Sequence, residues 1–322
     1  MKVLGIGNAL VDILIRLDDD SFLAKLGLPR GCMQLVTKES SDQILHQVQN
    51  LVKKHSAGGS AANTIHGLAR LGIETGFVGK IGKDDLGEFF LKDLKNSLIT
   101  DHLCLSSTQT GRAIALISPD GERTFATYLG AAVELVSGDL DPKVFSEYQL
   151  IHIEGYLVQN HELLMSIAKL AKANNMKISL DLASFNIVEE NLTFLQDYVS
   201  EFVDILFANE EEAKSFTGKN REAALSDMAK IVETAVVKIG RDGSLVWHNG
   251  EYSKVGIIDA HPIDTTGAGD LYAAGFLYGL IEGKTSQQCG WYGAILSGHV
   301  IQNLGAKISQ EQWELILQKI KG

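Results

Sequence analysis

Short runs of β-branched and aliphatic residues alternate with longer amphipathic segments along most of the chain. The short runs are apolar at nearly every position, which is typical of parallel strands buried on both faces. They cover residues 3–6, 75–78, 150–153, 177–180, 205–208 and 235–239. Apolar residues recur at three- and four-residue steps, as in crossover helices, over residues 161–174, 191–202 and 221–232. The alternation predicts an α/β fold with a doubly wound, mostly parallel sheet flanked by helices.

Two regions interrupt this alternation with strands that no long helix separates. One combines residues 13–17 with 31–36, and the other spans 106–129. In the second region, Pro119-Asp120-Gly121 lies between alternating segments, a composition typical of a hairpin turn. We therefore predict a small β-sheet that stands off the large one as a lid, built from segments of about 13–37 and 106–129. With four prolines and no evident linker, residues 1–322 are expected to form one domain.

The segment Asp264-Thr265-Thr266-Gly267-Ala268-Gly269-Asp270 directly precedes an apolar helical run over residues 271–277. Gly267, Ala268 and Gly269 are small enough for backbone N–H groups to approach a bound anion, and the helix start adds partial positive charge. Asp270 falls in the first helical turn, where its carboxylate could accept the proton of a hydroxyl. Asp and Gly are also common at helix starts without any site. The whole segment indicates phosphoryl transfer, with residues 267–269 as anion site and Asp270 as base.

Two polar residues follow the first predicted strand, in Gly5-Ile6-Gly7-Asn8-Ala9-Leu10-Val11-Asp12. Asn8 and Asp12 come just after the strand's carboxyl end, where open α/β sheets bind ligands. A carboxylate can accept hydrogen bonds from two neighbouring hydroxyls, which suits the cis-diol of a ribose. An ordinary loop acid is the alternative for Asp12. The segment lacks the third glycine of a dinucleotide fingerprint, so an NAD site fits poorly.

A second glycine-rich segment, Ala57-Gly58-Gly59-Ser60-Ala61-Ala62-Asn63-Thr64, also precedes a helical run. No Lys-Ser or Lys-Thr pair follows its glycines, so it is not a Walker loop. Gly58 and Gly59 would let the backbone approach a sugar, and the Asn63 amide could donate and accept hydrogen bonds. Tight helix packing alone is the alternative explanation for the glycines.

Two further features, a helix start and a turn, lie in the second half of the chain. Asn209 and Glu212 begin a predicted helix, lie on one face of it, and could orient a hydrated Mg²⁺ and phosphates. Simple helix initiation is the alternative, because glutamates favour the first turn. Gly240 and Gly243 lie in a turn between two predicted strands over residues 236–246, for which a plain hairpin is the alternative.

In this order, these motifs resemble those of the PfkB family of ribokinase-like sugar and nucleoside kinases, over nearly the whole chain. The 264–270 segment is similar to the family's C-terminal signature. The N-x-x-E pattern at 209–212 is similar to a second conserved motif of the family. Residues 7–12 and 122–132 are most similar to the adenosine kinase branch. The resemblance implies the ribokinase-like fold and ATP-dependent phosphorylation of a primary hydroxyl of a nucleoside or sugar, with adenosine preferred and a ribokinase- or fructokinase-like sugar kinase as the alternative.

The resemblance also implies roles for particular residues and cofactors. ATP would bind with Mg²⁺, near Gly240, Gly243 and, through water, Glu212. Arg123 would be a lid residue that meets phosphate on closure, and Tyr156 would lie against a base, although a plain core or surface aromatic is equally expected there. K⁺ is a candidate ligand of Asp264, and the lid is a candidate homodimer interface. A non-catalytic nucleoside or nucleotide sensor and an NAD-dependent oxidoreductase are the alternatives of other classes.

The charge of the chain limits its partners. The 40 acidic and 29 basic residues give a formal charge of −11 and a pI near 5.3, which argues against nucleic acid and anionic membranes as partners. Three widely spaced cysteines, including Cys32, fit reduced thiols in a cytoplasmic protein rather than disulfides or zinc. No segment approaches the ~18–20 apolar residues of a membrane span.

Overall fold

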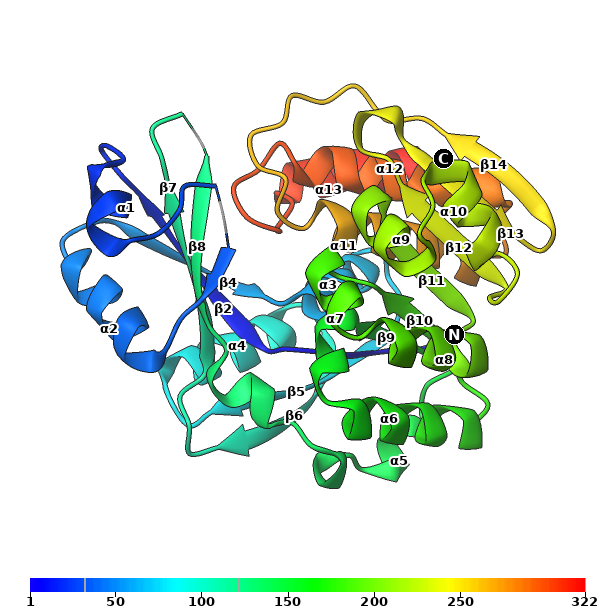
Figure 1. Cartoon of the computed structure of the whole chain (residues 1–322), viewed down its shortest axis with the longest axis horizontal. Helices are drawn as coiled ribbons and strands as arrows, with labels where there is room; N and C mark the ends of the chain where they lie inside the picture. Colours follow the sequence, from blue (N-terminus) through cyan, green and yellow to red (C-terminus); the bar gives the residue numbers. More distant parts are fainter. Residues whose placement is uncertain (32, 121, 322) are drawn as a thin grey trace.

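The predicted apolar runs form the centre of a large nine-stranded sheet (Figure 1). The computed structural model describes residues 1–31, 33–120 and 122–321. In spatial order the strands are β14 (Glu251–Val255), β13 (Ser244–His248), β12 (Thr234–Lys238), β11 (Ile205–Asn209), β10 (Lys177–Asp181), β9 (Leu150–Glu154), β1 (Val3–Ile6), β5 (Thr75–Gly82) and β6 (Ile99–Ser106). The seven strands from β12 to β6 in this order pair in parallel, and β13 and β14 are antiparallel to their neighbours. The predicted α/β class with a mostly parallel sheet is therefore confirmed.

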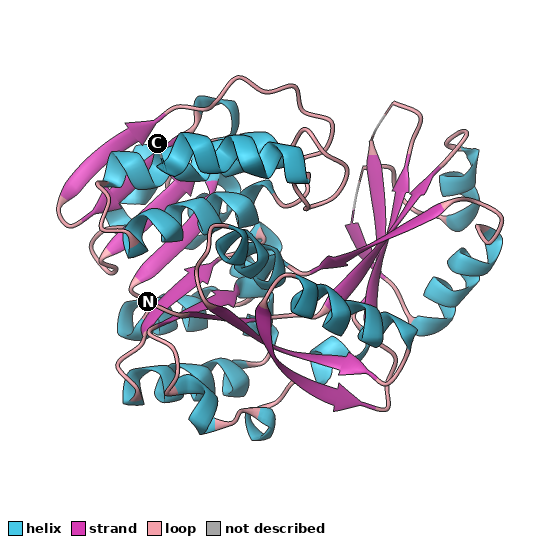
Figure 2. Ribbon diagram, turned by 180° about the vertical axis from the view of Figure 1, so that it is seen from behind, coloured by secondary structure: helices cyan, strands magenta, loops and turns pink. Residues whose placement is uncertain are grey.

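Helices cover both faces of the large sheet, which explains why its strands are apolar throughout (Figure 2). Within β1, for example, Leu4 and Ile6 belong to the core on one face and Val3 to the core on the other. The first face is covered by α5 (Pro142–Phe145), α6 (His161–Ala173), α7 (Phe185–Glu190), α8 (Leu192–Phe202), α9 (Glu210–Thr217) and α10 (Arg221–Met228). The second is covered by α3 (Ser60–Arg70), α4 (Asp85–Asn96), α11 (Ala268–Ile281), α12 (Ser286–Val300) and α13 (Gln310–Lys321).

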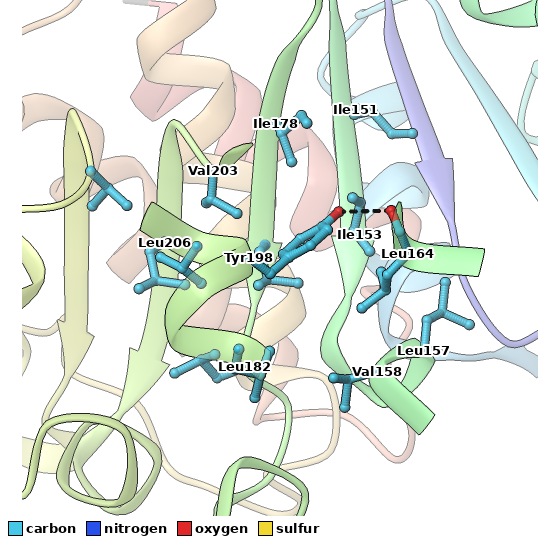
Figure 3. Close-up of a cluster of buried hydrophobic side chains, with 14 of the residues drawn as sticks. Ile151, Ile153, Leu157, Val158, Leu164, Ile178, Leu182, Tyr198, Val203 and Leu206 are labelled. Carbon is cyan, nitrogen blue, oxygen red and sulfur yellow. Dashed lines mark hydrogen bonds between the residues drawn. The ribbon is translucent and has the colours of Figure 1, made fainter. Parts of the chain in front are cut away.

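Figure 3 shows part of the core on the first face. The Tyr198 ring lies among aliphatic side chains from β9 to β11, and its hydroxyl donates to the carbonyl oxygen of Leu164 on α6 (3.3 Å). A buried tyrosine contributes a large apolar area, and this hydrogen bond satisfies its one polar group. The packing fixes the strands, and therefore the polar residues at their carboxyl ends.

A second sheet of five strands stands beside the large one (Figure 1). Its core also contains residues from α1 (Ser21–Leu26) and α2 (Lys38–Gln47). Its strands, in spatial order, are β3 (Met33–Leu35), β8 (Arg123–Tyr128), β7 (Gly111–Ile117), β2 (Leu10–Arg16) and β4 (Lys53–Gly58). The predicted small sheet is thus present, but β2 begins before residue 13, residue 106 belongs to β6, and β4 lies outside both expected segments. Strand β4 is polar at most positions, so it carries no apolar alternation.

Several details differ from the predicted elements. The helices expected over 161–174, 191–202 and 221–232 are present as α6, α8 and the shorter α10. The turn predicted at 119–121 includes Gly121, which, like Cys32, lies outside the described residues; the hairpin is closed by the Ser118 amide, which donates to the Glu122 carbonyl (2.8 Å). Short 3₁₀ helices cover Gly130–Glu134, Ser137–Asp139, Gly155–Gln159 and Gly240–Asp242. Among the described residues, no helix combines the length and apolar character needed to cross a membrane.

Candidate active site

The carboxyl ends of the central strands face a cavity of about 920 Å³. The N-terminal turns of α3, α9 and α11 reach the same cavity. Open α/β sheets bind ligands at this edge. Asn8 and Asp12, which were also expected at a ligand site, do not line this cavity. Predicted site residues on the cavity lining are Tyr156, Asn209, Glu212, Gly240, Gly243, Ala268, Gly269 and Asp270.

The glycine-rich segment forms a tight turn into α11. Gly267 is the N-cap residue and adopts a left-handed conformation with φ 76°. The Ala268 amide donates to the Thr265 carbonyl (3.1 Å), and the Leu271 amide makes the first bond to Gly267 (2.8 Å). In the part of the chain that the structure describes, the Gly269 and Asp270 amides have no such acceptor. Of the expected donors Gly267, Ala268 and Gly269, the turn itself uses the Ala268 amide, and the Asp270 amide is a further free donor among the described residues.

Asp270 lies in the first turn of α11, and two side chains of α3 bind its carboxylate. Ser60 Oγ donates to one oxygen (2.8 Å) and Asn63 Nδ2 to the other (2.9 Å). Burial raises the pKa of Asp270 to about 6, while the hydrogen bonds from Asn63 and Ser60 oppose that rise. The carboxylate is therefore oriented, partly desolvated and ionised at neutral pH, as a general base requires. Asn63, an expected substrate ligand, uses its Nδ2 on Asp270. Ser60, also in the first turn of α3, was not predicted.

Removing the Ser60 hydroxyl should change the pH dependence of the reaction. The hydroxyl donates to the ionised Asp270, so Ser60→Ala should raise the pKa of that carboxyl above its present value of about 6. The acidic limb of kcat/KM should move to higher pH by up to about one unit. Thr64→Val is the matched control, because Thr64 Oγ1 donates to the Asp270 carbonyl oxygen (3.1 Å) and not to its carboxylate. Equal shifts in both variants would contradict the assignment.

Asn8 and Asp12 are both buried. Asn8 Nδ2 donates to Glu154 (2.5 Å), whose second oxygen accepts from the Ala61 amide at the start of α3 (3.1 Å). Burial raises the pKa of Glu154 to about 7. Glu154 was not predicted because it ends the apolar run of β9. The Asn8 amide is therefore anchored to protein, where a substrate contact was expected.

Asp12 is a strand residue of β2 in the small sheet, not a loop acid. Burial raises its pKa to about 7, although Lys307 and Arg123 oppose the shift. A methyl group at Gly58 would lie 2.6 Å from Asp12 Oδ1, so this glycine leaves room for the carboxylate. Gly59 has φ +102°, and a side chain there would overlap the Asn8 carbonyl oxygen. The two glycines thus allow β2, β4 and α3 to approach each other closely.

Asn209 and Glu212 form a complete capping box at the start of α9. The Glu212 carboxylate accepts from the Asn209 amide (2.7 Å) and from Asn209 Nδ2 (2.6 Å). Burial raises the pKa of Glu212 to about 7. Helix capping, the simpler alternative, is therefore a real role of this pair, and both residues also line the cavity. Among the described residues no cluster of three or more His, Cys, Asp or Glu side chains could bind a metal directly.

The turn between β12 and β13 closes the far side of the cavity. Gly240 and Gly243 have φ +57° and +94°, and a side chain at Gly243 would overlap the Val255 carbonyl oxygen. The predicted strand, glycine turn and returning strand are confirmed. Tyr156 lies on the 3₁₀ helix after β9 and lines the cavity as a partly buried aromatic.

Arg123 and Asp264 connect the small sheet to the glycine-rich turn. Arg123 Nη2 lies 2.7 Å from Asp264 Oδ2, and both side chains are buried. Asp264 also accepts from the Thr266 amide (3.0 Å) and the Gly305 amide (2.6 Å). The carboxylate proposed as a K⁺ ligand is thus neutralised by a guanidinium and saturated by protein donors. A cation bound there would be repelled by Arg123, so the geometry argues against that role in this conformation.

Known proteins share both the sequence pattern and the fold. A profile of pfkB family carbohydrate kinases matches residues 31–313. A probable sugar kinase from Rhizobium etli CFN 42 has a TM-score of 0.89 at 31% identity, over 99% of this chain and 98% of that one. Adenosine kinase from Sinorhizobium meliloti has a TM-score of 0.88 at 32% identity, over 99% of both chains. A curated relative, 5-dehydro-2-deoxygluconokinase 2 from Bacillus cereus, is 30% identical over 297 residues, covering 82% of this chain and 85% of that protein.

The family profile spans most of the chain, including the glycine-rich segment at residues 57–64 and the 264–270 turn. The two structures extend the agreement to both sheets. An oxidoreductase is excluded by this match. The chain belongs to the pfkB family of carbohydrate kinases, has the ribokinase-like fold, and is a sugar or nucleoside kinase, that is, a phosphotransferase.

Proposed function

We propose that the protein transfers the γ-phosphoryl group of ATP to a primary hydroxyl of a nucleoside, with adenosine as the preferred acceptor. The observation that carries the catalytic part is the Asp270 carboxylate, bound by Ser60 and Asn63 beside free amides at the start of α11. The likeness to an adenosine kinase over 99% of both chains supports the acceptor class. So does Tyr156, an aromatic on the cavity lining that could stack on a base.

In this proposal the acceptor lies between Asp12 and Asp270. The Asp12 carboxylate would accept hydrogen bonds from sugar hydroxyls, and the buried Asn63 Oδ1, which has no partner among the described residues, would accept another. The primary hydroxyl would attack the γ-phosphorus while the bond from phosphorus to the β,γ-bridging oxygen breaks. Asp270 would take the hydroxyl proton, and the Gly269 and Asp270 amides would stabilise the charge on the transferring group.

Kinases of this family use ATP, typically with Mg²⁺. The residues around the cavity fit a metal that keeps its water shell, because Glu212 and Asp181 present carboxylates whose oxygens already accept protein hydrogen bonds. These two residues would bind the metal's waters, and the metal would neutralise phosphate charge when bound.

We also propose that the small sheet acts as a lid. Arg123 of β8 reaches the glycine-rich turn through Asp264 and Thr266, so the position of this sheet is coupled to the anion site. Closure would exclude water from the transferring phosphoryl group. A homodimer through the lid stays a prediction.

A sugar kinase is the second candidate, because a 5-dehydro-2-deoxygluconokinase is 30% identical to this chain. An ADP-release assay with ATP and Mg²⁺ separates the candidates. The panel is adenosine, other nucleosides, ribose, fructose and 5-dehydro-2-deoxygluconate. We expect adenosine to have the highest kcat/KM, by at least about 10²-fold over ribose. Ribose lacks the base, so polar groups of the site that would bind the base would be left buried without partners.

Other outcomes of the panel assign other functions. A sugar or sugar acid as best acceptor would overturn the nucleoside proposal but leave the role of Asp270 intact. Tight binding of a nucleoside without ADP release for any alcohol would support the sensor alternative.

A further inference from the structure

Lys238 is a cation on the cavity lining to which the sequence motifs assigned no role. It ends β12, and its side chain is 16% exposed. Its Nζ lies 2.7 Å from Oδ2 of Asp181, the last residue of β10. Arg241, the other cation on the lining formed by described residues, is exposed on the glycine turn. Lys238 is thus the cation that the fold fixes inside the cavity.

The Lys238 ammonium lies against the anion site. A methyl group built on Gly269 would lie 3.0 Å from Lys238 Nζ. Gly269 supplies one of the free amides and directly precedes Asp270. A group bound to those amides would therefore lie within contact distance of a charged lysine, whose flexible four-carbon chain can adjust its reach.

The charges around Lys238 indicate that it has more than a structural role. Burial lowers its pKa, but Asp181, Glu212 and Asp270 together raise it, so the lysine stays protonated. Three acids share this one ammonium. The acidic side chains of such a site repel a triphosphate unless cations held in the site offset their negative charge. Lys238 is placed to supply one at the point where phosphate would meet Gly269.

We propose that Lys238 is a catalytic residue that exchanges its ion pair with Asp181 for the γ-phosphoryl group of the donor. The inference rests on the proposed function in one respect, that the phosphate donor occupies this cavity. On donor binding the ammonium turns from Asp181 to the γ-phosphoryl oxygens. It then follows the negative charge as the phosphoryl group passes to the acceptor, and Asp181 becomes free to accept from water near the phosphates.

The test measures binding without an acceptor and without Mg²⁺, by calorimetry with AMP-PNP and ADP. Lys238→Met removes the charge and keeps the length of the side chain. We expect roughly 10- to 100-fold weaker binding of AMP-PNP and a smaller loss for ADP, which lacks the γ-phosphoryl group. Lys238→Arg should recover part of the AMP-PNP affinity. Arg241→Met, the control at the exposed cation, should change both affinities little and equally.

A purely structural role for Lys238 predicts a different pattern. Equal losses for AMP-PNP and ADP, or no loss, would overturn the inference. If Lys238→Met does not fold, Asp181→Asn replaces it: releasing the ammonium should tighten AMP-PNP relative to ADP, and an unchanged ratio would overturn the inference. A wild-type protein that binds neither nucleotide would overturn the donor site and this inference together. Failure of adenosine as acceptor affects neither, because no acceptor is present.

Discussion

Asp270→Asn is expected to lower kcat at least about a hundredfold while the affinity for nucleotide changes little. General-base assistance typically contributes about 10²- to 10⁴-fold, and an amide cannot accept the hydroxyl proton. The shape of the site should survive. The introduced amide can accept from Asn63 Nδ2 and donate to Ser60 Oγ, which can act as an acceptor as well as a donor. The measurements are kcat at saturating substrates and AMP-PNP affinity by calorimetry.

The pH dependence provides a second measurement on the same variant. The base must be ionised, and burial raises the pKa of Asp270 to about 6. The kcat/KM of the wild type should therefore rise with pH through about 6 and then level off. In Asp270→Asn, the residual rate should lack this limb.

Asp85→Asn is the control for this experiment, because Asp85 is also a first-turn acid, at the start of α4 and away from the cavity. It should leave kcat unchanged. Near-normal turnover in Asp270→Asn, or a rate loss of the same size in Asp85→Asn, would refute the role of Asp270 as base.

The local elements that carry the candidate site could be predicted because their residues occur in local patterns. The 264–270 turn, the glycines before α3 and the Asn209–Glu212 cap each combine small or polar residues with a helix start, so a short segment is enough to identify them. The apolar strands were predictable for the same reason, since burial on both faces leaves a continuous run. Strand β4 was not, because its polar residues follow no apolar period and its pairing with β2 depends on tertiary structure.

The missed residues depend on contacts between distant segments. Glu154, Asp181 and Lys238 each end an apolar strand, where one charged residue carries no pattern of its own. Their chemistry becomes visible only when parallel strands bring their carboxyl ends together. The Arg123–Asp264 ion pair joins the small sheet to the turn before α11, so neither residue's sequence context indicates its partner. The contact between Asn63 and Asp270 could not be predicted for a similar reason, because it depends on the packing of α3 against α11.

Gly267→Ala should lower kcat by about 10²-fold, the second large effect expected at this site. Gly267 has φ +76°, and an added methyl group would lie 2.5 Å from Ala306 Cβ. The turn must shift to relieve that contact, and the shift displaces the Gly269 and Asp270 amides from the transferring phosphoryl group. Loss of one such donor typically costs about 10²- to 10³-fold in kcat. The measurements are kcat and the free energy of unfolding in urea.

Gly283→Ala is the matched control, because Gly283 follows the other end of α11 with a similar φ of +67° and no atom within 4 Å of an added methyl group. The left-handed conformation costs an L-residue about 1–2 kcal/mol, so both variants should lose stability of that order. Gly283→Ala should keep its kcat, since the strain arises far from the cavity. If both variants lost rate in proportion to stability, the loss would reflect helix α11 as a whole, and the anion-binding role of its first turn would be wrong. A loss confined to Gly267→Ala separates the geometry of the amides from the stability of the helix that carries them.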